Sequence, residues 1–290
     1  MGLLAQGIAT GILIGGLYAL MSLGISLSWG ALKIINLAHF SFILLSAYLV
    51  YQITISFGVD PLLTTGVVLP LFFVFGAVMQ MFFHQFKVDE FKSLIVTFGV
   101  FIILQSMMQS IWSADFRTIG PNLNIYRSSS IRIAGIALPI PSLMAFVAAV
   151  LIAVAMSILL SRSYFGKAVR AVAQDAEMAR AFGVDTKRVA VLLSGLSAVF
   201  SALAGVFIAV GQQIFPGLAV SWFGIVFPVV ILGGLGHTVG TLTAGVIVGV
   251  AYGVAAVMWA PLAAPLVTFL ILIAALLFRP HGLLTSRSVA

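Results

Sequence analysis

Long apolar runs separated by short polar stretches repeat along the whole of this 290-residue chain. Each run has roughly 18 or more residues, the length that a helix needs to cross the hydrocarbon core of a bilayer. The pattern predicts membrane-spanning helices near residues 3–28, 34–57, 62–84, 93–113, 138–160, 190–210, 222–235, 240–259 and 262–278. The seventh run is short and ends in glycines, so it is either a crossing or a half-helix or re-entrant segment, which gives eight or nine crossings. Because the connecting segments are short, residues 1–290 should form a single transmembrane domain, an all-α helical bundle.

Two of these runs are interrupted by polar residues or glycines, one early and one late in the chain. In "SLSWGALKIINLAHFSF" the polar Asn36 and His39 are three residues apart and would share a helix face. In "VVILGGLGHTVGTLTAG" five glycines and a histidine break a second run. Such paired interruptions indicate a substrate route in transporters; the alternative is polar contacts between helices and a tight turn. The candidate translocation residues are Asn36, His39, Phe40, Ser41, Gly233, Gly234, Gly236 and His237.

Glycines also recur at four-residue spacing in the first and eighth predicted spans. These glycines are Gly7, Gly11 and Gly15, and Gly245, Gly249 and Gly253. Small residues on one helix face let two backbones approach closely in lipid, so we expect tight helix packing here. The alternative is a glycine-lined substrate path.

The composition supports a membrane protein, because 62% of the residues are hydrophobic and only 7% are charged. A soluble domain needs more polar surface than this. The net charge of +7 would suit a nucleic-acid partner, but the basic residues lie between the predicted spans, as the positive-inside rule requires. We therefore expect contact with membrane lipid and no nucleic acid. The chain has no cysteine, which excludes disulfides, thiolate metal sites and cysteine nucleophiles.

The segment "SRSYFGKAVRAVAQDAEMARAFGVDTKR", residues 161–188, carries nine of the 21 charged residues (14 basic and 7 acidic). Six of the nine are Lys or Arg, so loop 162–189 is expected in the cytoplasm. Alternation of the spans then places the short loop near Lys87 and the C-terminal tail on the same side. The stretch 114–135 falls on the opposite side, although it contains three arginines.

Within this segment, residues 167–182 should form an amphipathic helix about 24 Å long between two glycines. Such a helix could bind lipid, cap the bundle, or fit a groove on a soluble partner. Its mixed charges weaken the lipid interpretation, and the lack of an energy source in the chain favours the partner. The candidate contact residues are Lys167, Val169, Arg170, Val172, Gln174, Asp175, Ala176, Glu177, Ala179 and Arg180.

Several kinds of chemistry have no residues to support them in this sequence. All seven acidic residues fall at predicted loops or span ends, which argues against a proton-coupled carrier with a carboxylate relay. The four histidines are far apart, so we expect no metal site and no catalytic residues. No phosphate-binding motif for ATP occurs either, so energy must come from an ion gradient or from another chain.

Four stretches together resemble one known family over nearly the whole chain. They are "GLYALMSLGISLSWGALKIINLAH" at 16–39, "GKAVRAVAQDAEMARAFGVDTKRV" at 166–189, "VVILGGLGHTVGTLTAGVIVG" at 229–249 and "LLFRPHGLL" at 276–284. In this order they are similar to the permease subunits of the branched-chain amino acid family of ABC importers. The family usually continues "AH" with glycine and an acidic residue, whereas this chain has "AHFSF", so its solute need not be the usual one.

The resemblance implies a permease of the bacterial inner membrane that works as a dimer with an identical or homologous second permease. It also implies cytoplasmic ATPase subunits, which bind ATP and Mg, and an extracytoplasmic solute-binding protein; this chain itself would hold no cofactor. The helix at 167–182 would be the coupling helix that docks into an ATPase groove. The solute would be a branched-chain or other hydrophobic amino acid, with urea, short amides and small organic acids as related possibilities. The alternative is a stand-alone sodium-coupled carrier or a passive channel.

Overall fold

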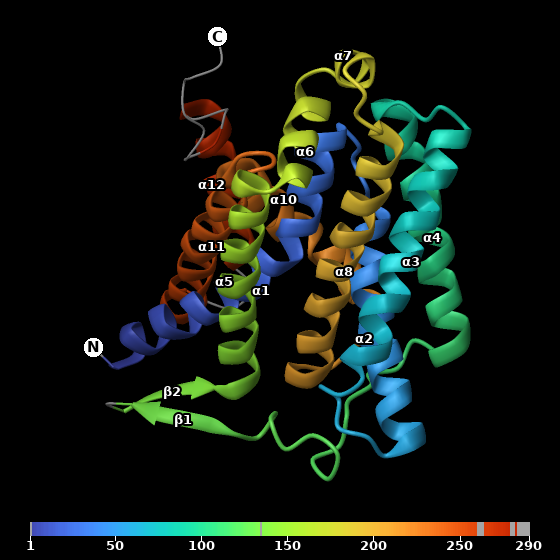
Figure 1. The fold of residues 1–290 in the computed structure, drawn as a ribbon. Coiled ribbons are helices and arrows are strands. Elements are labelled where there is room, and N and C mark those ends of the chain that lie inside the picture. Colours follow the sequence, from blue (N-terminus) through green and yellow to red (C-terminus); the bar gives the residue numbers. More distant parts are fainter. Residues whose placement is uncertain (1, 134, 260–263, 279–281, 283–290) are drawn as a thin grey trace.

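A computed structural model describes residues 2–133, 135–259, 264–278 and 282 of this chain. These residues form a helical bundle with a small β-hairpin at one end and helix α7 at the other, here called the hairpin end and the α7 end (Figure 1). Seven of the described helices are long and apolar enough to cross a membrane: α1 (Gly2–Leu32), α2 (Ala38–Phe57), α3 (Thr65–Gln85), α4 (Glu90–Trp112), α5 (Ile140–Arg162), α8 (Thr186–Gly211) and α11 (Thr238–Met258). The shorter helices are α6 (Tyr164–Gln174), α7 (Ala176–Ala181), α9 (Leu218–Ser221), α10 (Phe223–Gly233) and α12 (Ala264–Phe278). The predicted all-α membrane bundle is confirmed.

The short seventh run forms α10, which carries the chain from the hairpin end toward the α7 end (Figure 1). Before α9, Ile214 pairs with Arg117 at the hairpin end. After α10, the amide of Gly236 donates to the carbonyl of Ser26, in the part of α1 near the α7 end. This segment therefore traverses the bundle and does not return to the end from which it came.

Helix α1 packs closely and antiparallel against α11 through the two glycine series. A Cβ atom at Gly11 would lie 2.6 Å from the carbonyl oxygen of Gly249, and one at Gly15 would lie 2.6 Å from that of Gly245. Only glycine permits this separation, so the predicted tight packing is confirmed.

The β-hairpin was not predicted from the sequence. Its strands, β1 (Ser130–Ile133) and β2 (Ile136–Pro139), pair antiparallel with Ile131 opposite Leu138. The side-chain amide of Gln6 donates to the carbonyl of Ala137 (2.7 Å) and accepts from its amide (2.8 Å). The Gln6 side chain thereby makes the pair of backbone hydrogen bonds that a neighbouring strand would make, and it fixes the hairpin to α1.

The predicted single helix over 167–182 is wrong, because two helices occupy this segment. Asp175 separates α6 from α7 with extended backbone angles (φ −154°, ψ 108°). Its carboxylate accepts from the amides of Glu177 and Met178, each at 2.9 Å, and so caps the start of α7. Aspartate is among the most favourable N-cap residues, and this local bond competes with a continuous helix. Of the two glycines expected to bracket the helix, Gly183 (φ +86°) follows α7 in the left-handed conformation. The other, Gly166, lies inside α6, which begins at Tyr164.

Candidate functional site

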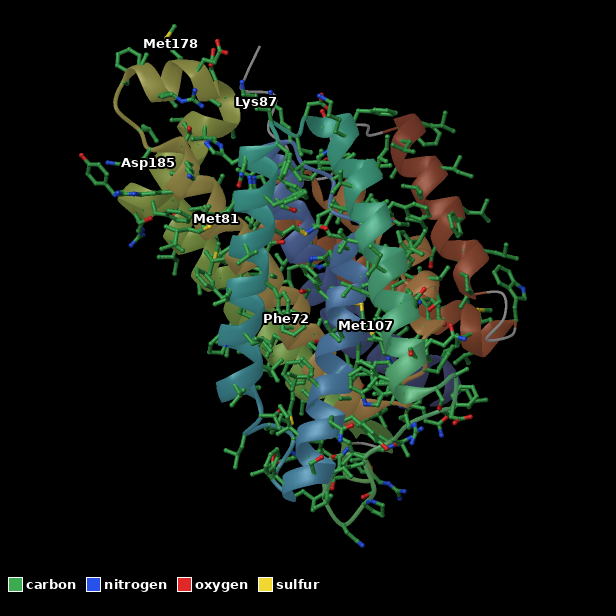
Figure 2. The ribbon with its side chains drawn as sticks, turned by 90° about the vertical axis from the view of Figure 1, so that its right-hand side faces the viewer. Phe72, Met81, Lys87, Met107, Met178 and Asp185 are labelled. Atoms are coloured by element: carbon green, nitrogen blue, oxygen red, sulfur yellow. The ribbon has the colours of Figure 1, made fainter. Side chains whose placement is uncertain are left out.

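Helices α6 and α7 present a mixed apolar and charged surface at one end of the molecule (Figure 2, where Met178 lies at the tip). Three large apolar side chains lie open there: Tyr164 (89% exposed), Met178 (57%) and Phe182 (83%). The charged Glu177 and Arg180 are also exposed. Aromatic and methionine side chains among dispersed charges are typical of protein-binding surfaces. We call this set the α6–α7 surface.

The predicted coupling residues divide between this surface and the bundle. Val169 and Ala179 are buried, and Val172 is half-buried. Val169 belongs to a small apolar cluster with Ala31, Val189 and Leu193, against which Val172 packs. These side chains hold α6 on the bundle. The predicted residues that remain exposed are Lys167, Arg170, Gln174, Asp175, Ala176, Glu177 and Arg180.

Arg170 is directed toward the bundle although its side chain is exposed. Its guanidinium donates to the carbonyl of Leu160 in the last turns of α5. The side chain also lines a cavity between α1, α5, α6 and the turn that leads into α11 (Thr238–Met258). Arg170 therefore links α6 to α5, and a docking role is better suited to Met178 and Phe182. Phe182 belongs to the apolar stripe that the sequence predicts, but neither residue is among the predicted contact residues.

The connection between α3 and α4 lies at the α7 end as well, where Figure 2 places Lys87. Asp89 there accepts from the amide of Lys92 (2.8 Å) and pairs with its ammonium group (2.9 Å). These hydrogen bonds hold the pKa of the Asp89 carboxyl below its usual value. The residue thus stays ionised and caps the first turn of α4.

The residues around His39 are buried and hydrogen-bonded to neighbouring helices. The Nε2 atom of His39 lies 2.8 Å from the carbonyl oxygen of Met21 in α1, and Ser41 donates to the carbonyl of Phe101 in α4 (3.2 Å). The ring of Phe40 packs on that of Phe223 in α10, with centroids 4.1 Å apart. These contacts serve helix packing.

Two polar atoms in this group have no partner among the described residues: Asn36 Oδ1 and His39 Nδ1, both buried. An unsatisfied buried polar atom is costly, so it calls for an explanation. Both atoms could bind a passing polar solute, and the role of Asn36 and His39 in a translocation path stays a prediction.

The second predicted stretch forms the turn between α10 and α11. Gly234 (φ +85°) and Gly236 (φ +78°) adopt left-handed backbone conformations, which explains the glycines. The amide of Gly236 reaches both the carbonyl (2.9 Å) and the hydroxyl (3.1 Å) of Ser26. Gly233 packs against the start of α11, and His237 is exposed. Helix α1 thus contacts both predicted stretches, through Met21 and through Ser26.

Two cavities lie near α1, one toward each end of the bundle. The cavity toward the α7 end, the α7-end cavity, has a volume of about 330 Å³ and is lined in part by Gly236, His237 and Arg170. The one toward the hairpin end, the hairpin-end cavity, has a volume of about 360 Å³ and is lined by residues of α1, α5, α8, α9, α10, α11 and α12. Asn36, His39, Phe40 and Ser41 line neither of them. No sequence pattern pointed to the hairpin-end cavity, because its lining comes from seven separate helices.

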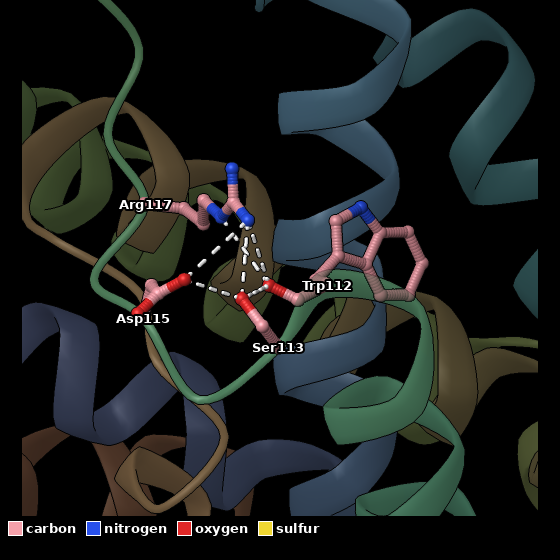
Figure 3. Close-up of polar contacts among 4 residues, drawn as sticks. All are labelled: Trp112, Ser113, Asp115 and Arg117. Atoms are coloured by element: carbon pink, nitrogen blue, oxygen red, sulfur yellow. Dashed lines mark hydrogen bonds and ion pairs between the residues drawn. The ribbon is translucent and has the colours of Figure 1, made fainter.

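The segment after α4 is fixed at the hairpin end by Arg117 (Figure 3). Its guanidinium donates to the carbonyl of Trp112 (3.0 Å) and to the hydroxyl of Ser113 (3.1 Å), and lies 3.9 Å from the Asp115 carboxylate. At least one of the three arginines in this stretch therefore has a structural role, which accounts for a basic residue opposite the α7 end.

The chain matches the family described as the branched-chain amino acid transport system permease component over residues 7–276. The high-affinity branched-chain amino acid transport system permease protein BraD of Pseudomonas aeruginosa is 26% identical to it, over 96% of this chain and 95% of BraD. LivH of Escherichia coli, which has the same description, is 26% identical over 96% of this chain and 94% of LivH. A probable branched-chain amino acid transport permease protein LivH of Methanocaldococcus jannaschii is 24% identical over 94% of this chain and 90% of its own length. No solved structure was found to match the fold.

Proposed function

This chain belongs to the family of branched-chain amino acid transport system permease components, and we propose that it is the membrane permease of an ATP-driven importer. Its solute would be a branched-chain or other hydrophobic amino acid. ATP hydrolysis would take place in separate cytoplasmic subunits, and an extracytoplasmic solute-binding protein would deliver the solute. A second permease, identical or homologous, would complete the membrane part in the bacterial inner membrane.

The α6–α7 surface is the observation that supports this proposal best. Met178 lies beyond the ends of the long helices and Phe182 directly follows α7, so a soluble subunit can reach both side chains (Figures 1 and 2). The buried side of α6, including Val169, packs on the bundle, so force applied to α6 and α7 passes to the helices. An ATPase that grips this surface can move it and so switch the access of the permease between the two sides. Under this proposal the α7 end faces the cytoplasm; the C-terminal tail, expected there too, lies outside the described residues.

Co-purification of ATPase subunits tests the proposal. The double variant Met178→Asp/Phe182→Asp replaces two exposed apolar side chains and should fold and insert like the wild type. We expect the ATPase subunits that co-purify with the tagged wild-type chain to be lost from this variant. The matched control is Ile133→Asp, which changes an exposed residue (59%) of the hairpin and should leave co-purification intact. Equal recovery of ATPases with all three proteins would contradict docking at α6–α7.

A further inference from the structure

The hairpin-end cavity has a polar mouth and an apolar floor. At the mouth, the polar Gln212 and Ser221 are exposed together with Gly211 and Pro265, and Ser142 is half-buried. Four side chains are almost completely buried below them: Met21 (0% exposed), Ile208 (0%), Trp222 (3%) and Ile225 (8%). None of the described residues that line this cavity is charged.

This lining sets the chemistry of an occupant. Ser142, Gln212 and Ser221 offer neutral donors and acceptors to a polar group at the mouth. The floor favours an aliphatic group and disfavours a charged side chain, because a buried charge without a partner is costly. The cavity volume of about 360 Å³ is near the lower end of the range for small-molecule sites, so the occupant must be small.

Aromatic rings form part of the cavity lining. The rings of Tyr18 in α1 and Tyr252 in α11 meet edge to face, with centroids 5.9 Å apart. Trp222 lines the same cavity, and all three side chains are large with few rotatable bonds. These side chains limit the size of an aliphatic group that enters.

The cavity is closed on the side toward the α7 end by a separate apolar cluster from the same helices. The buried members of this cluster are Leu23, Leu27, Ala153, Met156 and Phe200. Its members on α1 and α5 come later along these helices than the residues that line the cavity. Leu27 also lines the α7-end cavity, so the cluster lies between the two cavities. On α1, the step of six residues from Met21 to Leu27 corresponds to about 9 Å.

We propose that the hairpin-end cavity binds the transported solute by its aliphatic part, with its polar group at the mouth. The occupant is a small molecule with neutral or zwitterionic polar groups and an uncharged aliphatic side chain. The apolar cluster closes the far end of this site in the state that the structure shows. This inference rests on the proposed transport function and adds the place and the selectivity of solute binding.

Cysteine labelling tests the proposal directly, because the native chain has no cysteine. Ser142→Cys and Ser221→Cys each place one thiol at the mouth. Ser56→Cys, an exposed position at the hairpin end outside the cavity lining, is the matched control. In membrane vesicles that contain the complete transporter, L-leucine should slow the reaction of N-ethylmaleimide with the thiols at positions 142 and 221 severalfold. L-lysine should not slow it, and neither amino acid should affect the control.

Equal labelling rates with and without L-leucine at both mouth positions would overturn the proposal. Equal protection by L-lysine would overturn the selectivity. ATP-dependent leucine uptake, measured in the same vesicles, separates this inference from the proposed function. If uptake needs ATP but leucine gives no protection, the cavity assignment fails and the importer function stands. If leucine protects both thiols but uptake needs no ATP, the importer function fails and the cavity assignment stands.

A filling substitution gives a second measurement. Ala145 lines the cavity and is 1% exposed, whereas Ala155 on the same helix is exposed outside the lining. Ala145→Phe should lower leucine uptake by about tenfold or more, because the phenyl ring would occupy the space of the solute. In a hydrophobic pocket a difference of a single methylene already changes the preference for a substrate by about tenfold or more. Ala155→Phe should leave uptake unchanged. Normal uptake by a stably inserted Ala145→Phe protein would contradict the proposal.

Discussion

At the scale of single residues, glycine determines how closely α1 and α11 approach. A methyl group at Gly11 would meet the backbone of Gly249, which cannot move away as a flexible side chain can. Gly99 in α4 has no atom within 4 Å of such a methyl group. The two positions therefore distinguish a glycine required by packing from one that is not.

The same substitution should lower stability at the first site and not at the second. Gly11→Ala should lower stability by on the order of 1–3 kcal/mol, because the helices must separate. Gly99→Ala should be neutral or raise stability by about 0.5–1 kcal/mol, because alanine favours the helix. Thermal unfolding of both variants in the same detergent measures the difference. Equal midpoints would show that the contact between α1 and α11 is not tight.

Residue-level sequence patterns predicted some of these roles and missed others. The four-residue glycine spacing predicted close packing, because that spacing alone defines one helix face. Asn36 and His39 were found as polar interruptions, but their partners could not be. His39 contacts Met21, eighteen residues away on another helix, and only the packing of the helices brings the two together.

A bulky apolar residue at position 39 should disturb the packing of α2 against α1 as well as transport. The His39 side chain is fully buried, and Gly24 on α1 lies against its ring. His39→Trp should therefore lower the thermal midpoint, whereas His39→Gln keeps a polar group near the Met21 carbonyl and should lower it less. Equal thermal midpoints for the two variants would contradict this placement.

At the scale of secondary-structure elements, Asp175 separates α6 from α7. Asp175→Ala removes the cap, which costs about 1 kcal/mol, and introduces a strong helix former. We expect the two helices to join and the positions of Met178 and Phe182 to change. ATPase co-purification should fall while the protein still inserts, and Asp175→Asn, which keeps a capping side chain, should restore it. Full co-purification with the alanine variant would show that the break is not needed.

The break shows why element boundaries are harder to predict than elements. The helix-forming composition of 167–182 was clear, but a single side chain in contact with two backbone amides overrode it. The β-hairpin escaped prediction for a related reason. Its strands have four residues each and depend on Gln6, which is 131 residues from Ala137.

At the scale of the whole molecule, the charged segment and the alternation of the spans predicted which loops share an end. Figures 1 and 2 place α7 and Lys87 at one end and the hairpin at the other. The succession of apolar runs predicts which loops share an end, because each membrane crossing reverses the direction of the chain. The pattern of apolar runs does not predict the cavities, since residues of seven helices line the one at the hairpin end.

Single cysteines can test this arrangement in intact cells. Gln85→Cys and Gln174→Cys should react with a membrane-impermeant maleimide only after the cytoplasmic side is exposed. Ser128→Cys should react from outside. All three native residues are exposed, so reactivity should report sidedness. Labelling of positions 128 and 174 from the same side would contradict the arrangement.

The central claim, that a motor made of other polypeptides drives this bundle, is tested most directly by uptake into proteoliposomes. The purified complex with its ATPase subunits and solute-binding protein should accumulate L-leucine only when ATP is present on the ATPase side. The permease alone should accumulate none, with or without a sodium gradient. Accumulation by the permease alone, in the absence of ATP, would contradict the claim.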